Sequence, residues 1–220
     1  MQSREFILKL LHLDEVPVGE FDFAVQLYKN LAEKINNLYG YDGGGRAPSL
    51  IEQEDAAIIY AICRLMRPKI VVETGVSDGV SSAMFLAALN RNNEGNLLSI
   101  DFPVIGTPRV YGKKPGWVVP DAIRTRWKLL QGESSKLLVR AIQSEGRINL
   151  FFHDSEHSYV NMYRELLTAA SLSESDAILL ADDAFENDAL LDVAQQMSVD
   201  NAQIAFTLQG LGGMRIHKTA

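Results

Sequence analysis

Carboxylates stand directly after two of the short apolar runs in this chain, and together they could hold a cation. Asp154 follows the run at residues 148–152, and Asp182 and Asp183 follow the run at residues 176–181. Three carboxylates at neighbouring strand ends would repel one another unless a cation neutralised them. A hard divalent ion such as Mg²⁺ suits these oxygen ligands. The residues therefore predict a metal site, with capping of the next turn as the alternative role of Asp182 or Asp183.

A second stretch that could do chemistry spans residues 69–90 and reads KIVVETGVSDGVSSAMFLAALN. Its β-branched run predicts a buried strand before Glu73, and Gly75 and Gly79 bracket a polar turn before an apolar helix. Such a turn points backbone N–H groups and the positive end of the helix at an anionic ligand. The spacing is G-x-x-x-G, whereas the dinucleotide fingerprint is G-x-G-x-x-G. An ordinary turn between a strand and a helix is the alternative interpretation.

The elements that must position these residues alternate along the chain. Helices are expected at residues 4–13, 21–38, 49–66, 135–142, 159–170 and 187–197, and strands at residues 70–72, 96–101, 127–130, 148–152, 176–181, 203–209 and 213–217. This order predicts an α/β fold: a Rossmann-like, doubly wound sheet of seven mostly parallel strands with one antiparallel edge strand. Ligands of such sheets bind outside the carboxyl ends of the strands, where the acidic residues fall.

Two long loops and the first helices are expected to lie outside this sheet. Residues 39–48 contain three consecutive glycines, and residues 102–120 form a long insertion rich in Gly and Pro. Both segments are free to cover the ligand face, because long loops in compact domains are often functional. We therefore divide the chain into a helical extension with a glycine loop, residues 1–48, and a main domain, residues 49–220.

Composition limits the function classes. The chain has 220 residues, a formal charge of −7 and a pI of about 5.1, which argues against nucleic acid as a partner. It has no long apolar segment near Met1 or elsewhere, so we expect a cytoplasmic protein that does not enter a membrane. Its single cysteine, Cys63, lies in an apolar stretch and is expected to be a buried small hydrophobe.

Four motifs in order resemble class I S-adenosylmethionine (SAM)-dependent methyltransferases. They are E-T-G-V-S-D-G-V-S-S, the acid Asp101 that ends the second strand, Q-G-E-S after the third strand and A-D-D after the fifth. Within that class the chain is most similar to cation-dependent O-methyltransferases of the catechol O-methyltransferase type. The segment H-D-S-E-H-S-Y is also similar to bacterial methyltransferases that act on sugars and natural products. The resemblance covers about residues 49–217.

The resemblance implies a cofactor site for SAM. Glu73, Gly75 and Gly79 would form the cofactor turn, and Ser81 would bind the methionine carboxylate at the start of the helix.

The ribose and adenine would lie beside the next two strands. Asp101 would accept both ribose hydroxyls, and its chemistry suits this role because one carboxylate can accept two hydroxyl protons of a cis-diol. A solvated strand end is the alternative for Asp101. Glu133 and Ser134 would border the adenine.

The resemblance also implies a catalytic site on the acidic side. The metal ligands would be Asp154, Asp182 and Asp183, although the third ligand of the family is usually Asn. The family's lysine base, three residues after the first aspartate, is absent and His157 has that spacing. His157 is therefore the candidate general base, and a structural histidine bonded to Glu156 is its alternative. His153 is expected to be a buried histidine.

These residues predict a SAM-dependent and Mg²⁺-dependent O-methyltransferase. Its partner would be a small-molecule hydroxylated acceptor such as a phenol, sugar or natural product, and the sequence leaves a homo-oligomer open. Two alternatives are a nicotinamide-dependent oxidoreductase and a non-catalytic binding module with a methyltransferase fold. The oxidoreductase would lack its third glycine and would leave the acidic residues without a role.

Overall fold

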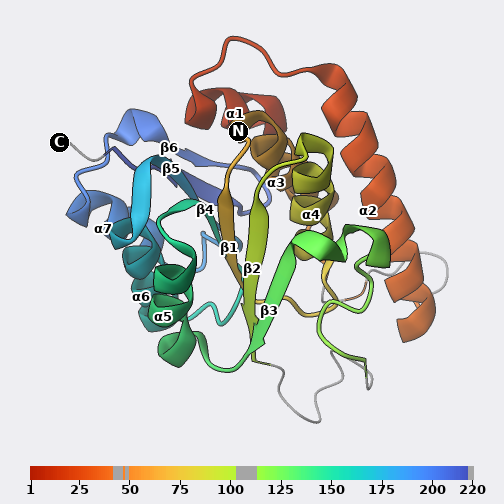
Figure 1. Ribbon diagram of the computed structural model, residues 1–220. Helices are drawn as coiled ribbons and strands as arrows, with labels where there is room; N and C mark the ends of the chain where they lie inside the picture. The colour runs from red at the N-terminus through yellow and green to blue at the C-terminus, as the bar shows by residue number, and fades with distance from the viewer. Residues whose placement is uncertain (42–46, 48–49, 103–112, 218–220) are drawn as a thin grey trace.

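The structure is a computed structural model that describes residues 1–41, 47, 50–102 and 113–217. Its centre is a seven-stranded sheet with the order β3-β2-β1-β4-β5-β7-β6 (Figure 1). The strands are β1 (Ile70–Thr74), β2 (Asn96–Asp101), β3 (Trp127–Gln131), β4 (Ile148–His153), β5 (Ser173–Ala181), β6 (Ile204–Phe206) and β7 (Gly212–Arg215). Strand β7 is antiparallel to both β5 and β6, while β1 to β5 pair in parallel. The predicted Rossmann-like sheet is confirmed, and its antiparallel strand lies one position inside the edge strand β6.

Helices cover both faces of this sheet (Figure 1). They are α1 (Ser3–Leu11), α2 (Val18–Tyr39), α3 (Gln53–Met66), α4 (Val80–Asn92), α5 (Ser134–Glu145), α6 (Tyr159–Ser171) and α7 (Ala189–Gln196), with short 3-10 helices at Asp121–Arg126 and Asn201–Gln203. Val71 packs into the apolar cluster on the side of α1 to α4, and Val72 packs into the cluster on the side of α5 to α7. Burial on both faces explains why the central strands read as continuous apolar runs.

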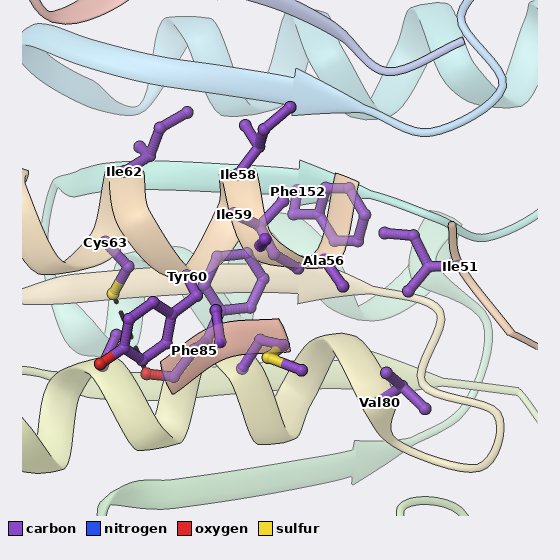
Figure 2. Close-up of a cluster of buried hydrophobic side chains, with 14 of the residues drawn as sticks. Ile51, Ala56, Ile58, Ile59, Tyr60, Ile62, Cys63, Val80, Phe85 and Phe152 are labelled. Atoms are coloured by element: carbon purple, nitrogen blue, oxygen red, sulfur yellow. Dashed lines mark hydrogen bonds between the residues drawn. The ribbon is translucent and has the colours of Figure 1, made fainter. Parts of the chain in front are cut away.

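Helix α3 forms the centre of one layer. Its residues from Ala56 to Cys63 are all buried, and Ile58 and Ile62 point away from Tyr60 and Cys63 (Figure 2). A surface helix would show one apolar stripe, so this burial on all sides requires a second layer outside α3. Helices α1 and α2 supply that layer, and they confirm the predicted N-terminal helices.

Cys63 confirms its predicted role, because it is fully buried and burial raises the pKa of its thiol. Arg64 on the same helix forms an ion pair with Glu20 of α2, with an Nη2 to Oε1 distance of 2.9 Å. The N-cap of α3 is Glu52, so the helix begins at Gln53 and later than predicted from Ser49, which lies outside the described residues. The division of the chain at residue 48 stays a prediction.

Most of the two predicted cover loops, residues 42–46, 48–49 and 103–112, also lie outside the described residues. Across the part of the chain that the structure describes, no helix is both long and apolar enough to cross a membrane.

Candidate active site

The glycine turn between β1 and α4 lies against two other segments. Gly75 has φ +85°, and a Cβ atom there would lie 1.7 Å from the carbonyl oxygen of Asp154. Gly79 has φ +100°, and a Cβ atom there would lie 2.5 Å from the Cα of Gly116. Both positions therefore require glycine, for the left-handed backbone and for the close approach of neighbouring main chain.

Asp101 at the end of β2 faces this turn. Its Oδ1 accepts a hydrogen bond from the backbone N–H of Val76 at 3.0 Å. Burial raises the pKa of Asp101, while hydrogen bonds from the N–H groups of Val76 and Ser77 act in the opposite direction. Asp101 and Val76 of the turn, which are 25 residues apart in the sequence, are thus brought together as parallel strand ends require.

Glu73 supports the turn from inside the protein. It is fully buried, and its carboxylate accepts hydrogen bonds from the hydroxyls of Ser81, Ser82 and Ser99 at 2.6, 2.5 and 2.6 Å. Burial raises the pKa of Glu73 to about 7 despite these bonds. The single hydroxyl proton of Ser81 is donated to Glu73, so the predicted bond from Ser81 to a methionine carboxylate would require an exchange of partners.

Glu133 and Ser134 begin helix α5 beside Asp101. The backbone N–H of Gly132 donates to the carbonyl oxygen of Asp101 at 2.9 Å, which places the start of α5 next to the end of β2. Glu133 is the N-cap residue and forms an ion pair with Lys136 at 2.7 Å. The Ser134 hydroxyl instead reaches inward and donates to Glu165.

The segment after β2 contributes to the same turn through its described end. Gly116 donates its N–H to the carbonyl oxygen of Ser77 at 2.9 Å, and Trp117 donates its Nε1–H to the buried Asp78 at 2.5 Å. The hydroxyl of Tyr39, at the end of α2, also donates to Asp78 at 3.1 Å. The ends of both predicted cover loops are therefore attached to the glycine turn.

The predicted acidic residues lie past the ends of β4 and β5. Asp154 donates its N–H to Thr74 at 2.8 Å, and Asp182 donates its N–H to His153 at 2.9 Å, so three neighbouring strand ends are joined. Burial and the charges of four nearby carboxylates raise the pKa of Asp154 well above its ordinary value. Among these charges, that of Asp182 has the largest effect. Asp183 has φ +50° and a side chain that is 51% exposed.

His157 lies close to two of these carboxylates. Its Nε2 lies 3.9 Å from Oδ1 of Asp154 and 3.9 Å from Oδ2 of Asp183, and its side chain is 24% exposed. Burial and the neighbouring His153 lower the pKa of His157, although Asp183 and Glu186 oppose this. A neutral imidazole beside the strand ends suits proton abstraction near neutral pH.

The predicted metal ligands are not gathered into a metal site in this arrangement. Within the described ranges, no group of three or more His, Cys, Asp or Glu side chains could hold a metal ion. The ring nitrogen Nε2 of His157, rather than an open space, lies 3.9 Å from an oxygen of both Asp154 and Asp183. The donor set as arranged therefore does not fit an ion, and we derive no step through one.

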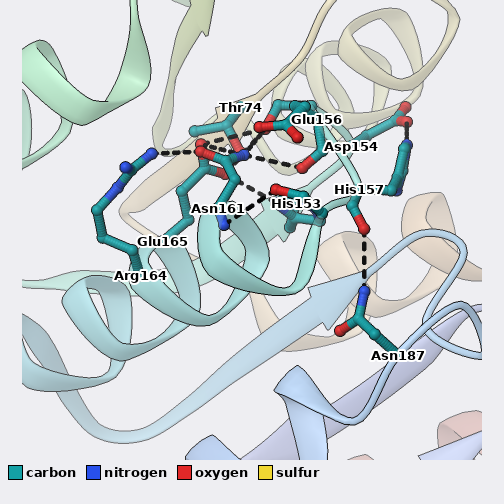
Figure 3. Close-up of polar contacts among 11 residues, drawn as sticks. Thr74, His153, Asp154, Glu156, His157, Asn161, Arg164, Glu165 and Asn187 are labelled. Carbon is teal, nitrogen blue, oxygen red and sulfur yellow. Dashed lines mark hydrogen bonds and ion pairs between the residues drawn. The ribbon is translucent and has the colours of Figure 1, made fainter.

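A buried polar cluster beneath the site was not predicted from the sequence. It centres on Glu165 of α6, which accepts hydrogen bonds from Thr74 at 2.5 Å, His153 at 2.7 Å and Asn161 at 3.2 Å (Figure 3). His153 is fully buried, as predicted. The sequence did contain an indication of this cluster. Glu165 lies on the apolar face of α6, four residues before Ala169, and a buried carboxylate at such a position requires hydrogen-bond partners.

Asp55 is a second buried carboxylate that sequence reasoning missed. It lies in the first turn of α3, is fully buried, and neither carboxylate oxygen has a hydrogen-bond partner among the described residues. Burial and the charge of Asp182 raise its pKa to about 7, and the Thr207 hydroxyl acts in the opposite direction. The pKa of Asp55 thus depends on the acidic residues past β5.

Comparisons with known proteins agree with this architecture. A family model described as a methyltransferase domain matches residues 72–184, which include the glycine turn and the acidic residues. No curated protein matches the sequence.

Several solved structures share the fold. The O-methyltransferase TomG from Streptomyces achromogenes, involved in tomaymycin synthesis and solved with SAM, has a TM-score of 0.63 and 11% identity over 86% of this chain and 89% of that chain. The O-methyltransferase from Bacillus cereus, solved with SAH, has a TM-score of 0.61 and 10% identity over 86% and 91%. A methyltransferase from Geobacter sulfurreducens has a TM-score of 0.59 and 16% identity over 87% and 88%.

Proposed function

The chain belongs to the methyltransferase domain family and has the class I fold, and from this premise we propose that it methylates a hydroxyl group of a small molecule with SAM. The observation that carries this proposal is the approach of Asp101 to the glycine turn. That pairing puts a carboxylate for the ribose hydroxyls beside backbone N–H groups at the start of α4. The SAM and SAH in the structures of the fold relatives support the same choice of cofactor.

The acceptor would bind past the ends of β4 and β5. SAM, when bound, supplies a methyl group on a positively charged sulfur. His157 would accept the proton of the acceptor hydroxyl at Nε2, so that the oxygen becomes a better nucleophile. The deprotonated oxygen would then accept the methyl group that SAM supplies, with SAH as the other product. Asp183 lies near the imidazole, and its carboxylate favours the positive charge that the ring gains.

Dependence on Mg²⁺ is a separate part of the proposal. A cation would relieve the repulsion among Asp154, Asp182 and Asp183, but the described side chains are not arranged to hold an ion as they stand. The arrangement of His157 between Asp154 and Asp183 would first have to change. Turnover in excess EDTA, compared with turnover after Mg²⁺ is restored, separates a cation-dependent enzyme from one in which His157 alone removes the proton.

The test is transfer of a deuterated methyl group from labelled SAM to a panel of phenols and sugars, followed by mass spectrometry. We expect one acceptor class to gain the labelled methyl group, and His157→Gln to lower turnover by about 100-fold or more. The matched control is His217→Gln, which changes an exposed histidine paired with Asp176 far from the strand ends. Oxidation or reduction of a panel member with NAD, without methyl transfer, would contradict the proposal.

A further inference from the structure

Glu165 is a fully buried carboxylate on α6 that accepts hydrogen bonds from Thr74 and His153. We propose that Glu165 is a positioning residue, which acts through His153 to hold the imidazole of His157 in place for proton abstraction. This inference rests on the proposed function, because that function gives His157 its role. Six contacts carry it.

The first contact fixes the tautomer of His153. Nδ1 of His153 lies 2.7 Å from Oε2 of Glu165, and both side chains are fully buried. Hydrogen bonds from His153, Ser134 and Thr74 hold the pKa of Glu165 below its ordinary value although burial opposes this. An ionised carboxylate only accepts hydrogen bonds, so the proton must be on Nδ1 of His153. Nε2 of His153 is buried and has no hydrogen-bond partner among the described residues.

The second contact passes this constraint to His157. The two imidazole rings meet edge to face, with centroids 5.5 Å apart and an interplanar angle of 83° (Figure 3). His153 cannot rotate away without breaking its bond to Glu165. The His153 ring therefore stays in one orientation and, by contact, limits the orientation of the His157 ring. In that orientation Nε2 of His157 lies near Asp154 and Asp183.

The remaining contacts hold the chain between the two histidines. Ser155 donates its hydroxyl to Glu165 at 3.1 Å, and Asn161 donates its side-chain amide to Glu165 at 3.2 Å and to the carbonyl oxygen of Glu156 at 2.9 Å. The carbonyl oxygen of His157 accepts a hydrogen bond from Asn187 at 2.9 Å. The backbone of His157 is thus held by its neighbours, while Glu165 controls the ring through His153.

The experiment is imidazole ¹⁵N NMR of the full-length protein with labelled histidine, free and saturated with SAH. In the wild type we expect the signals of a His153 ring that carries a proton on Nδ1, and a single set of His157 signals. Glu165→Gln keeps the size of the side chain but weakens the acceptor, so His153 should populate the other tautomer. The His157 signals should then shift or broaden. Turnover with an acceptor that the wild type methylates should fall about 10-fold or more, with little change in the KM for SAM.

A matched control separates positioning from plain support of the fold. Thr74→Val removes the 2.5 Å hydrogen bond to the same carboxylate and leaves the bond to His153 in place. It should lower the melting temperature, yet leave the His153 tautomer and the His157 signals as in the wild type. His153→Phe provides a second variant, which keeps a ring beside His157 but removes its bond to Glu165, and it should move the His157 signals as Glu165→Gln does.

The proposal would be overturned by a folded Glu165→Gln protein whose His153 and His157 signals match those of the wild type. It would equally be overturned if Thr74→Val moved those signals as far as Glu165→Gln. Failure of the wild type to bind SAH would count against the proposed function alone, because the signals of the free protein still decide whether Glu165 positions His157.

Discussion

Two buried carboxylates of this protein, Glu165 and Asp55, have different hydrogen-bond surroundings, and their pKa values shift in opposite directions. Glu165 receives hydrogen bonds from an imidazole, hydroxyls and an amide, which keep its pKa below the ordinary value despite burial. Asp55 has no hydrogen-bond partner among the described residues for either oxygen, and its pKa rises to about 7. Burial of a charge without partners is costly, so Asp55 binds a proton more tightly in the folded state.

This contrast predicts how Asp55 affects stability. Its folded pKa of about 7 lies above the ordinary value of 3.8, so the folded state loses stability as the pH rises between these two values. Asp55→Asn carries no charge at any pH. At pH 8 it should therefore be more stable relative to the wild type than at pH 4, by on the order of 2–4 kcal/mol. Urea unfolding of both proteins from pH 4 to pH 8 measures this, and parallel stability curves would exclude a raised pKa at Asp55.

A second prediction at this scale concerns the pH dependence of methyl transfer. Burial and His153 lower the pKa of His157 below its ordinary 6.5, and only the neutral imidazole can accept a proton. Turnover should therefore be level at neutral pH and fall only below pH 6.5, as His157 becomes protonated. A pH profile of kcat, measured with an acceptor that the protein is shown to methylate, tests this. A fall in kcat that begins above pH 7 would mean that a group other than His157 limits turnover.

Residues at strand ends could be predicted from the sequence, whereas the partners of buried polar side chains could not. Asp101 and the glycine turn were expected together, because the carboxyl ends of parallel strands meet at one edge. Glu165 and Asp55 lie within helices, where apolar periodicity predicts the buried face but does not identify a polar partner from another element. Ser81 shows the same limit, since its partner Glu73 belongs to the preceding strand.

The elements themselves followed the sequence closely where both faces of a strand are buried. Strand β2 has the predicted bounds, residues 96–101, and its four central residues are buried. Helix α3 differs at its start, because Glu52 rather than a hydroxyl side chain stands at the N-cap. Strands β6 and β7 are shorter than predicted, since glycines and the turn at residues 207–211 interrupt the hairpin.

The glycine turn gives the prediction that belongs to this scale. Gly75→Ala should destabilise the protein by more than about 2 kcal/mol, because the new Cβ would overlap the main chain of Asp154 at a left-handed φ. Gly19→Ala is the matched control in helix α2, where nothing lies within 4 Å of an added Cβ, and it should stabilise the protein by up to about 1 kcal/mol. Chemical unfolding measures both, and equal effects would contradict the close approach at Gly75.

Across the whole molecule, helices cover both faces of the sheet (Figure 1), and the predicted site residues lie at the carboxyl ends of its strands. The sequence predicted this edge, the order of strands and helices, and the grouping of acidic residues there. It did not predict that α1 and α2 would bury α3, or that His157 would stand between Asp154 and Asp183. These features depend on packing between segments that are far apart in the sequence. The pattern of apolar and polar residues in one sequence does not show which distant segments pack together.

The central claim is that this edge binds SAM, and isothermal titration calorimetry with SAH tests it most directly. We predict that the wild type binds one SAH and does not bind NAD. Asp101→Ala should weaken SAH binding by roughly 1–3 kcal/mol, because charged hydrogen bonds to the ribose are lost. Asp121→Ala, which removes a fully exposed carboxylate paired with Arg124, should leave the affinity unchanged. Binding of NAD without SAH, or equal SAH affinity in the wild type and a folded Asp101→Ala protein, would contradict this account.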